Sequence, residues 1–211
     1  MKSPTLPAVA RAFREIGRDF HTRGWVLGTS GNFSTVVSRQ PLKLVITASS
    51  VSKGDIRPVD VLTVGANGAL VGKSGKSVPR PSAETALHVA VVQSRRVGAV
   101  LHTHSVWSTM LSEIYVAERG LRLSGFEMLK GLEGVGTHEH TEWVPILEND
   151  QDIPSLARQV EAILVGRPDV HGFLLRGHGL YTWGEDLAQA RRHVEILEFL
   201  LETTGRMQQW P

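Results

Sequence analysis

The spacing of hydrophobic residues changes within the first third of the chain. From Leu6 to Phe20, apolar residues recur at helical spacing, which predicts an amphipathic helix. From Trp25 to Val71 they instead form short runs separated by Gly, Ser and Asn, which is typical of strands. The turn Ala66-Asn67-Gly68 between two of these runs predicts a hairpin. The predicted strands are 25–27, 33–37, 42–46, 61–64 and 69–71.

The rest of the chain alternates between helix and strand patterns. Some stretches carry apolar residues on one helical face and predict helices at 82–95, from 105 onwards, at 153–165 and at 185–203. Shorter apolar runs predict strands at 97–101, 143–147, 170–175 and 180–183. The stretch 118–141 is rich in Gly, Glu and His and is predicted to be irregular.

These elements predict an α/β fold built on a mixed central sheet. The strands at 97–101 and 170–175 each lie between predicted helices, whereas the region 25–71 is a meander of strands. Helices are therefore expected on both faces of the sheet. No repeat and no linker-like stretch interrupts the 211 residues, so we expect one domain over residues 1–211.

Composition and charge exclude several classes of protein. No stretch approaches the roughly 18 consecutive apolar residues of a membrane span, so no membrane association is expected. The net charge of +2 is too small for a nucleic-acid-binding surface. The chain has no cysteine, so any metal ion must be held by imidazole and carboxylate groups. The N-terminus leads into a polar helix and not into a signal peptide, so a cytoplasmic protein is expected.

Three histidines follow predicted strands and suggest a metal site. Residues two positions apart in a strand point to the same side, so His102 and His104, after the run 97–101, can reach one ion. His178 follows another apolar run and lies between two glycines, which leave its ring room to turn inward. Three imidazoles suit a catalytic metal ion with an open position, for which zinc is favoured over manganese, iron or cobalt. The alternative is that each histidine is simply a polar turn residue.

A second His-x-His pair, His138 and His140, lacks an apolar run leading into it. Its neighbours are polar, Glu142 among them. A solvated loop is therefore predicted, with a rim that contacts the substrate as the alternative.

Polar segments at strand and helix ends predict a phosphate site. Gly28–Asn32 and Thr47–Ser50 offer backbone N–H groups and hydroxyls after or between strands, and Ser82 begins a predicted helix. A helix N-terminus favours an anion because its N–H groups are unpaired. Each segment alone is more often a turn or a cap, but together they favour a phosphate pocket. The chain lacks the Walker motif and the dinucleotide fingerprint, so a nucleotide is not the expected ligand.

Two glutamates are candidates for acid/base chemistry. Glu84 lies in the first turn of the helix predicted from Ser82, where a carboxylate either joins a site or only complements the helix dipole. Glu127 lies within Gly125–Gly131, an unusually apolar setting for a carboxylate. Burial there would raise its pKa towards the range useful for proton transfer, whereas the alternative is an exposed acid in a surface loop.

Four motifs occur in the order found in the class II aldolase/adducin family, which this chain resembles from about residue 8 to residue 204. They are Thr29–Ser34, Arg80–Glu84, Leu101–Ser105 and Arg176–Gly179. The resemblance implies a three-layer α/β/α sandwich with a mixed, largely antiparallel central sheet, and assembly as a homotetramer. It also implies one zinc ion per subunit, with the ligands His102, His104 and His178. The implied phosphate contacts are Gly31, Asn32, Ser49, Ser50 and Ser82.

Three further segments resemble the branch of that family whose members remove water from a sugar phosphate. They are Gly125–Gly131, Val144–Asn149 and Gly177–Gly184. The resemblance implies that Glu127 is the catalytic acid/base and that the partner is a small sugar phosphate. A sugar-phosphate aldolase or 4-epimerase, in which Glu84 would be more central, is the alternative. A more distant alternative is a non-enzymatic, adducin-like interaction module, which is not expected to keep all three histidines.

Overall fold

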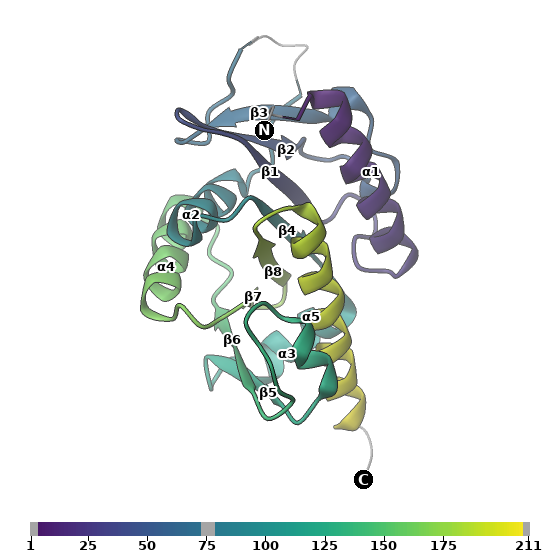
Figure 1. The fold of residues 1–211 in the computed structure, drawn as a ribbon, viewed down its shortest axis with the longest axis vertical. Coiled ribbons are helices and arrows are strands. Elements are labelled where there is room, and N and C mark those ends of the chain that lie inside the picture. Colours follow the sequence, from purple (N-terminus) through teal and green to yellow (C-terminus); the bar gives the residue numbers. More distant parts are fainter. Residues whose placement is uncertain (1–3, 73–78, 209–211) are drawn as a thin grey trace.

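The computed structural model describes residues 4–72 and 79–208, which form a sheet flanked by helices (Figure 1). Over these residues eight strands form one sheet, in the order β3-β2-β1-β4-β8-β7-β6-β5. Neighbouring strands are antiparallel, except that β6 and β7 are parallel. The strands are β1 (Asn32–Arg39), β2 (Leu42–Thr47), β3 (Val61–Gly65), β4 (Ala99–Thr103), β5 (Gly120–Ser124), β6 (Thr141–Leu147), β7 (Gly172–Leu175) and β8 (Gly179–Gly184).

Helices pack on both faces of this sheet. The helices are α1 (Leu6–Thr22), α2 (Thr85–Arg95), α3 (Val106–Ile114), α4 (Ile153–Gly166) and α5 (Leu187–Met207), with short 3-10 helices η1 (Lys53–Asp55), η2 (Pro58–Asp60) and η3 (Glu127–Gly131). On one face, α2 and α4 pack against sheet residues such as Leu44 and Phe173. On the other, α1, α3 and α5 pack against residues such as Phe33 and Leu180. The sheet is thus the middle of three layers, which confirms the predicted α/β/α sandwich.

Three helices begin at a capping side chain. Ser105 accepts a hydrogen bond from the Ser108 N–H at the start of α3, over 3.0 Å. Asp152 and Asp186 do the same for α4 and α5. Such a cap contributes about 1 kcal/mol and fixes where a helix starts. Because the α3 cap follows His104 directly, it also defines where the chain turns away from the end of β4. In the described residues no helix is long and apolar enough to cross a membrane.

The central strand β4 lies between β1 and β8 and is buried along its whole length. Its register places His102 between Asn32 of β1 and Tyr181 of β8. Gly179, at the start of β8, permits this close pairing, because a Cβ atom there would lie 2.0 Å from the Thr103 carbonyl oxygen. The ends of three adjacent strands therefore meet around His102.

Some predicted elements are wrong. Residues 25–27 form a loop, in which Val26 is buried beside α1 and the Trp25 carbonyl accepts from the His104 N–H. The predicted strand at 69–71 contributes only a bridge from Leu70 to Val64, although the turn before it is as predicted. The stretch predicted to be irregular contains β5. Pairing with β6 satisfies the β5 backbone, and within this short strand the buried Leu121 and Leu123 alternate with exposed polar residues, a pattern that the polar composition of the longer stretch conceals.

Candidate active site

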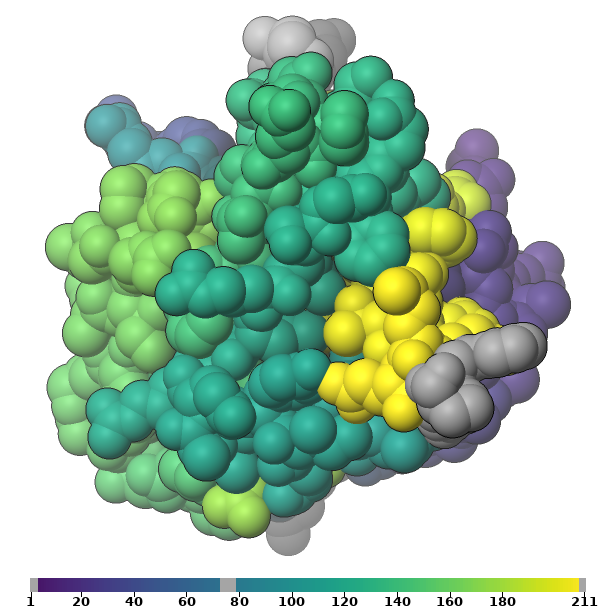
Figure 2. All heavy atoms as spheres, turned by 90° about the horizontal axis from the view of Figure 1, so that it is seen from below, coloured from purple at the N-terminus to yellow at the C-terminus, as the bar shows by residue number. Residues whose placement is uncertain are grey.

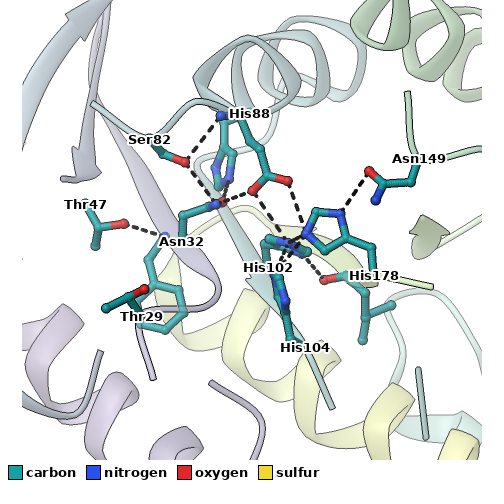
Figure 3. Close-up of polar contacts among 12 residues, drawn as sticks. Thr29, Asn32, Thr47, Ser82, His88, His102, His104, Asn149 and His178 are labelled. Carbon is teal, nitrogen blue, oxygen red and sulfur yellow. Dashed lines mark hydrogen bonds and ion pairs between the residues drawn. The ribbon is translucent and has the colours of Figure 1, made fainter. Parts of the chain in front are cut away.

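Three histidines converge at one end of β4 (Figure 3). His102 belongs to β4, His104 follows it, and His178 lies in the turn between β7 and β8. The Nε2 atom of His104 lies 2.8 Å from that of His102 and 3.0 Å from that of His178. The Nε2 atoms of His102 and His178 are 3.3 Å apart. The two-residue alternation of the strand and the turn after β7 thus bring together side chains from distant parts of the sequence.

Two of these rings are oriented through their other nitrogen. The Leu180 carbonyl oxygen lies 2.9 Å from His102 Nδ1, and Asn149 Oδ1 lies 3.3 Å from His178 Nδ1 (Figure 3). Because a carbonyl oxygen can only accept, each Nδ1 carries the hydrogen and each Nε2 keeps a lone pair. Lone pairs that face one another cannot hydrogen-bond together, but they can share a cation. This donor set therefore fits a divalent metal ion held by imidazole.

Burial keeps the three imidazoles neutral. It lowers the pKa of His102 well below its ordinary value, and the neighbouring histidines lower it further. It lowers the pKa of His104 to about 3. Burial also lowers the pKa of His178, although the charge of Glu84 opposes this effect. Neutral imidazole is the form that binds a metal ion, so the lone pairs remain available around neutral pH.

Glu84 lies at the N-cap of α2, and its carboxylate faces the histidines. Its Oε1 is 3.3 Å from His178 Nε2, and its Oε2 is 3.6 Å from His102 Nε2. Asn32 Nδ2 donates to Glu84 Oε2 over 2.5 Å and to Ser82 Oγ over 3.0 Å. Of the two interpretations of Glu84, its position therefore favours membership of the site, as a further ligand or as a group that moves a proton.

Behind Asn32 lies His88, a buried residue of α2 that the sequence analysis did not single out (Figure 3). Its Nε2 contacts Asn32 Oδ1, and its Nδ1 lies 2.7 Å from Ser34 Oγ. Burial lowers the His88 pKa to about 3, so the ring is neutral and one nitrogen donates while the other accepts. Since Asn32 Oδ1 can only accept, His88 donates to it and accepts from Ser34. These two hydrogen bonds hold the Asn32 amide with its nitrogen towards Glu84.

A cavity of about 390 Å³ opens beside the histidines. Its lining contains every residue for which a phosphate contact was predicted, namely Gly31, Asn32, Ser49, Ser50 and Ser82. Glu84, His104 and His178 line the same cavity. Gly31 has a positive φ of 71°, and a Cβ atom there would lie 2.6 Å from the His102 carbonyl oxygen, so the loop requires glycine to approach β4. Candidate anion-binding and metal-binding groups therefore share one space, of a size that suits a small molecule.

Lys53 is a second site residue that the sequence analysis missed. Its ammonium group donates to the Thr29 carbonyl over 2.8 Å and to the Val51 carbonyl over 2.6 Å. It therefore ties together the two loops that line the cavity. Burial lowers its pKa to about 8, against the opposing charge of Glu84. A lysine among small polar residues has no periodic signal, so only the folded chain reveals the role of Lys53.

A third missed residue, Glu198 of α5, lies on the other side of β4. It is buried, and its Oε1 accepts from Thr103 Oγ1 over 2.5 Å. Burial raises the pKa of Glu198 to about 7, although hydrogen bonds from Ser105 and Thr103 oppose that rise. Because Thr103 lies between His102 and His104, this contact helps to fix the end of β4. An inward-facing acid within an otherwise apolar helix face was the available signal.

Glu127 lies outside this cavity. It begins η3, its side chain is 74% exposed, and with Phe126, Met128 and Phe199 it lines a separate shallow pocket. The prediction that the Glu127 side chain is buried is therefore wrong for a single chain. Its oxygen accepts a 2.6 Å hydrogen bond from Lys130, and this bond and the lysine charge lower the Glu127 pKa instead of raising it. Apolar neighbours in the sequence do not bury a side chain that the 3-10 helix turns outward.

The second His-x-His pair is only partly solvated. His138 is exposed, as predicted. Glu142, however, is buried, and its Oε2 lies 3.0 Å from His140 Nε2 and 2.9 Å from His171 Nδ1. The loop that carries His138 and His140 therefore ends at a buried carboxylate, because β6 begins at Thr141 and the side chain of its second residue points inward.

Comparison with protein families gives one match that covers most of the chain. Residues 11–204 match the model of the class II aldolase and adducin N-terminal domain. A protein of Sorangium cellulosum named methylthioribulose-1-phosphate dehydratase is 45% identical over 199 residues, covering 94% of this chain and 92% of that protein. A protein of the same name from Azotobacter vinelandii is 41% identical over 206 residues, covering 97% of each chain.

Comparison with solved structures agrees with the fold. An L-fuculose 1-phosphate aldolase superposes with a TM-score of 0.78 at 20% identity, covering 99% of this chain and 89% of the other. The L-fuculose-1-phosphate aldolase of Thermus thermophilus superposes with a TM-score of 0.74 at 24% identity, covering 98% of both chains. At such identities these similarities establish the shared fold.

Proposed function

The chain belongs to the class II aldolase and adducin family, and from this premise we propose that it is a metal-dependent hydro-lyase. The proposed reaction, a step of methionine salvage, dehydrates 5-methylthioribulose 1-phosphate to 5-methylthio-2,3-dioxopentyl phosphate. The names of relatives at 41% and 45% identity support this choice of reaction. The observation that carries the proposal is that three histidine lone pairs converge beside a carboxylate, at one edge of a polar cavity that Lys53 also lines.

The polar end of the cavity suits the phosphate of the substrate. Gly31, Ser49 and Ser82 supply backbone and hydroxyl donors there. Lys53 adds a positive charge behind the two loops, and Ser82 and Glu84 place the N-terminus of α2, the positive end of its helix dipole, at the same cavity. Together these groups favour an anion over a neutral sugar.

A divalent ion at the histidines would be held by His102, His104 and His178, and zinc is the ion proposed, one per subunit. When bound there, the ion would supply Lewis-acid chemistry, which makes the hydrogen next to the substrate ketone acidic. The protein supplies the geometry. The Leu180 carbonyl and Asn149 orient two of the rings, and burial keeps the rings neutral.

Dehydration needs two proton transfers. A base takes the hydrogen from C3, and an acid protonates the hydroxyl leaving C4, so one C–H and one C–O bond break and one water departs. The resulting enol then takes up a proton at C4 and releases the proton of its C3 hydroxyl, which gives the diketone. The closeness of Glu84 to the histidines supports a role at C3. Glu127 is proposed as the group that protonates the leaving hydroxyl.

Because Glu127 lies outside the cavity of its own chain, we propose that it acts in the site of a neighbouring copy in a homotetramer. Its surroundings support this assignment. Met128 is 39% exposed and Phe199 is 47% exposed, and both line a pocket with Glu127. Lys130 keeps the Glu127 pKa low in the isolated chain, so burial against a second copy would be needed to bring the pKa into a range useful for an acid.

An exposed apolar stripe on α3 supports assembly with further copies of the chain. Val106, Met110 and Ile114 are exposed and recur one helical turn apart on α3. Figure 2 shows this end of the molecule, where the last turns of α5 (yellow) lie beside the teal part of the chain that contains α3. An exposed apolar surface of this kind is typical of a protein–protein interface.

An assay on purified protein tests the reaction. The metal content is measured, and diketone formation from 5-methylthioribulose 1-phosphate is compared with carbonyl fragments from fuculose and ribulose phosphates. Diketone formation by metal-loaded protein is expected. Protein that binds the ion but makes only carbonyl fragments would overturn the dehydratase assignment.

Mixing two inactive variants tests the shared site. Glu127→Gln lacks the acid and His102→Ala lacks a ligand, so sites formed between the two variants include some that have both groups. Activity is expected to return after the subunits are mixed and exchanged. No return, with mixed oligomers demonstrated by mass spectrometry, would contradict a shared site.

A sugar-phosphate aldolase or 4-epimerase is the second candidate, and one observation favours it. Glu84, not Glu127, lies beside the histidines within a single chain. An aldolase needs that carboxylate for proton transfer, so Glu84→Gln would abolish C–C cleavage. An adducin-like interaction module is less well supported, because the three histidine lone pairs converge.

A further inference from the structure

The segment that carries Glu127 is fastened to α5. Leu129 and Leu132 are buried in the apolar cluster that includes Ile196. A Cβ atom on Gly131 would lie 2.5 Å from Ile196 Cδ1, so the segment lies directly on the helix. Segment 127–133 is thus anchored on its inner side, while Glu127 stays exposed at its outer end.

The end of this segment is held by two histidines through its backbone. The Glu133 N–H donates to His193 Nε2 over 3.2 Å. The Glu133 carbonyl oxygen lies 2.8 Å from His171 Nε2. His171 precedes β7 and His193 belongs to α5, so two elements of the core bind both polar backbone groups of one loop residue. His171 and His193 are called the Glu133 clamp below.

The geometry requires the two rings to be in different protonation states. His193 Nδ1 lies 2.7 Å from the Trp183 carbonyl and must donate to it, so Nε2, which accepts from Glu133, has no hydrogen. His193 is therefore neutral. His171 Nε2 donates to the Glu133 carbonyl, and His171 Nδ1 faces a Glu142 oxygen at 2.9 Å, so an ionised Glu142 requires both nitrogens to carry hydrogens. His171 is therefore a cation.

Glu142 provides the countercharge. The carboxylate is buried. It also accepts hydrogen bonds from the backbone N–H of His171, over 2.8 Å, and from the His140 ring. Burial disfavours a charged His171, but the hydrogen bond and charge of Glu142 outweigh it and raise the His171 pKa above its ordinary value. Burial lowers the pKa of His193 to about 4. The protonation states required by geometry agree with these shifts.

We propose that His171 and His193 are positioning residues, which hold segment 127–133 and thereby Glu127 in the place where it acts. The inference rests on the proposed role of Glu127. Neither histidine touches the cavity beside His102, so their effect runs through the backbone of Glu133. Displacing a reacting group by about 1 Å can cost on the order of 10²-fold in rate, which is the effect expected when the clamp is lost.

The clamp also has a defined pH range. The charged or titratable groups that surround it are Glu142 and His140 of the β6 side, Arg192 and the Glu133 side chain near His193, and Arg95 of α2. His193 loses its acceptor when it is protonated, as pH falls through about 4. His171 loses one of its two donated hydrogen bonds as pH rises through its raised pKa. The clamp is complete between these limits.

The test uses the full-length, metal-loaded protein and four variants. His171→Ala and His193→Ala each remove one half of the clamp. His171→Gln keeps a donor for the Glu133 carbonyl but cannot titrate. His21→Ala is the matched control, since His21 is an exposed histidine of α1 away from the clamp. Metal content, kcat and KM for 5-methylthioribulose 1-phosphate, the pH profile of kcat, and amide hydrogen exchange of residues 127–135 are measured for each.

The two alanine variants are expected to keep their metal and KM but to lose about 10²-fold in kcat. Exchange at 127–135 should rise about tenfold, the factor that loss of one hydrogen bond gives. His171→Gln should retain most of kcat. Its kcat should no longer fall at alkaline pH where loss of the His171 proton lowers the wild-type value. An unchanged kcat and exchange rate in both alanine variants, or loss of kcat only in parallel with loss of metal, would overturn the proposal.

Hydrogen exchange separates this proposal from the proposed function. If the wild-type protein does not dehydrate the sugar phosphate, the function fails while raised exchange in the alanine variants still supports the clamp. If an alanine variant does not fold, His171→Gln carries the test through its pH profile and exchange. A His171→Gln protein whose alkaline limb matches that of the wild type contradicts the role of His171.

Discussion

Two parts of the molecule hold candidate proton-transfer groups in opposite surroundings. At the ends of β1, β4 and β8, Glu84, His104 and His178 line one cavity next to the buried His102, and hydrogen bonds orient the rings of His102 and His178 and the amide of Asn32. On η3, Glu127 points outward, paired with Lys130 and close to His138, and flanked by exposed apolar side chains. A site at the strand ends is complete in geometry within one chain, whereas the η3 carboxylate requires a second surface before it can meet a substrate.

The difference has a physical cause. Strand ends in the middle of a sheet are held by hydrogen bonds on both sides and by helices on both faces, so side chains there have little freedom. A short 3-10 helix at the periphery is held on one side only. Its other side is available to a partner, which explains why Glu127 is exposed although its neighbours are apolar.

The largest effect is expected at the strand ends. His102→Ala removes one of three lone pairs and leaves the two others unable to hold the ion alone. Metal and turnover should both be lost, while the fold, followed by circular dichroism, is retained. His21→Ala serves as the control, because His21 is an exposed histidine of α1 outside the cavity. Full metal content in the His102 variant would show that the ligand assignment is wrong.

A large effect without loss of metal is expected on η3. Glu127→Gln removes the proposed acid but lies away from His102, His104 and His178, so metal content should stay unchanged while kcat falls by about 10²–10⁴-fold. Glu139→Gln, an exposed acid of the nearby loop, is the matched control. Kinetics with metal analysis of the same samples checks this. Near-wild-type turnover would remove Glu127 from the mechanism and favour an assignment centred on Glu84.

A smaller effect is expected behind the histidines. Asn149→Ala removes the acceptor of His178 Nδ1 and frees the ring to turn. Loss of such an orienting contact typically costs 10–100-fold in metal affinity, a range expected here when affinity is titrated with a competing chelator. Asp150→Ala, on the neighbouring residue, is the control. Unchanged affinity would show that the strand end alone orients the ring.

The smallest effect concerns acid stability of the metal-free protein. His88 has a folded pKa of about 3, so between its ordinary pKa near 6.5 and about 3 the unfolded chain binds a proton that the folded chain does not. The free energy of unfolding should therefore fall as pH drops through this window. His88→Leu should flatten that dependence in urea titrations at several pH values, and an unaltered slope would contradict a neutral His88.

Part of the site could be predicted from the sequence because its signals are local. An apolar run followed by His102 and His104 predicts a strand whose side chains at alternate positions point to the same side. The glycines beside His178 predict a close approach of two backbones. The turn at 66–68 and the main helices are likewise properties of neighbouring residues. These patterns can be recognised in the sequence without knowing which residues pack against them.

Other features could not be predicted because they depend on partners far along the chain. Strand β5 exists because β6 pairs with it, and the buried Glu142 is paired with His171, which lies 29 residues further along the chain. The bridging role of Lys53 depends in the same way on two loops meeting around its ammonium group. Neither the burial of Glu142 nor the position of Lys53 leaves a periodic trace in the sequence.

The amino-acid sequence by itself determined the layered α/β fold and the identity of the three histidines, since hydrophobic period and strand alternation act over a few neighbouring residues. Only the tertiary structure decided that Glu84 lies beside those histidines while Glu127 faces outward, and that Glu133 is held by a charged and a neutral histidine. Burial and charge pairing depend on what surrounds a group in space, and that is settled only when distant segments pack together.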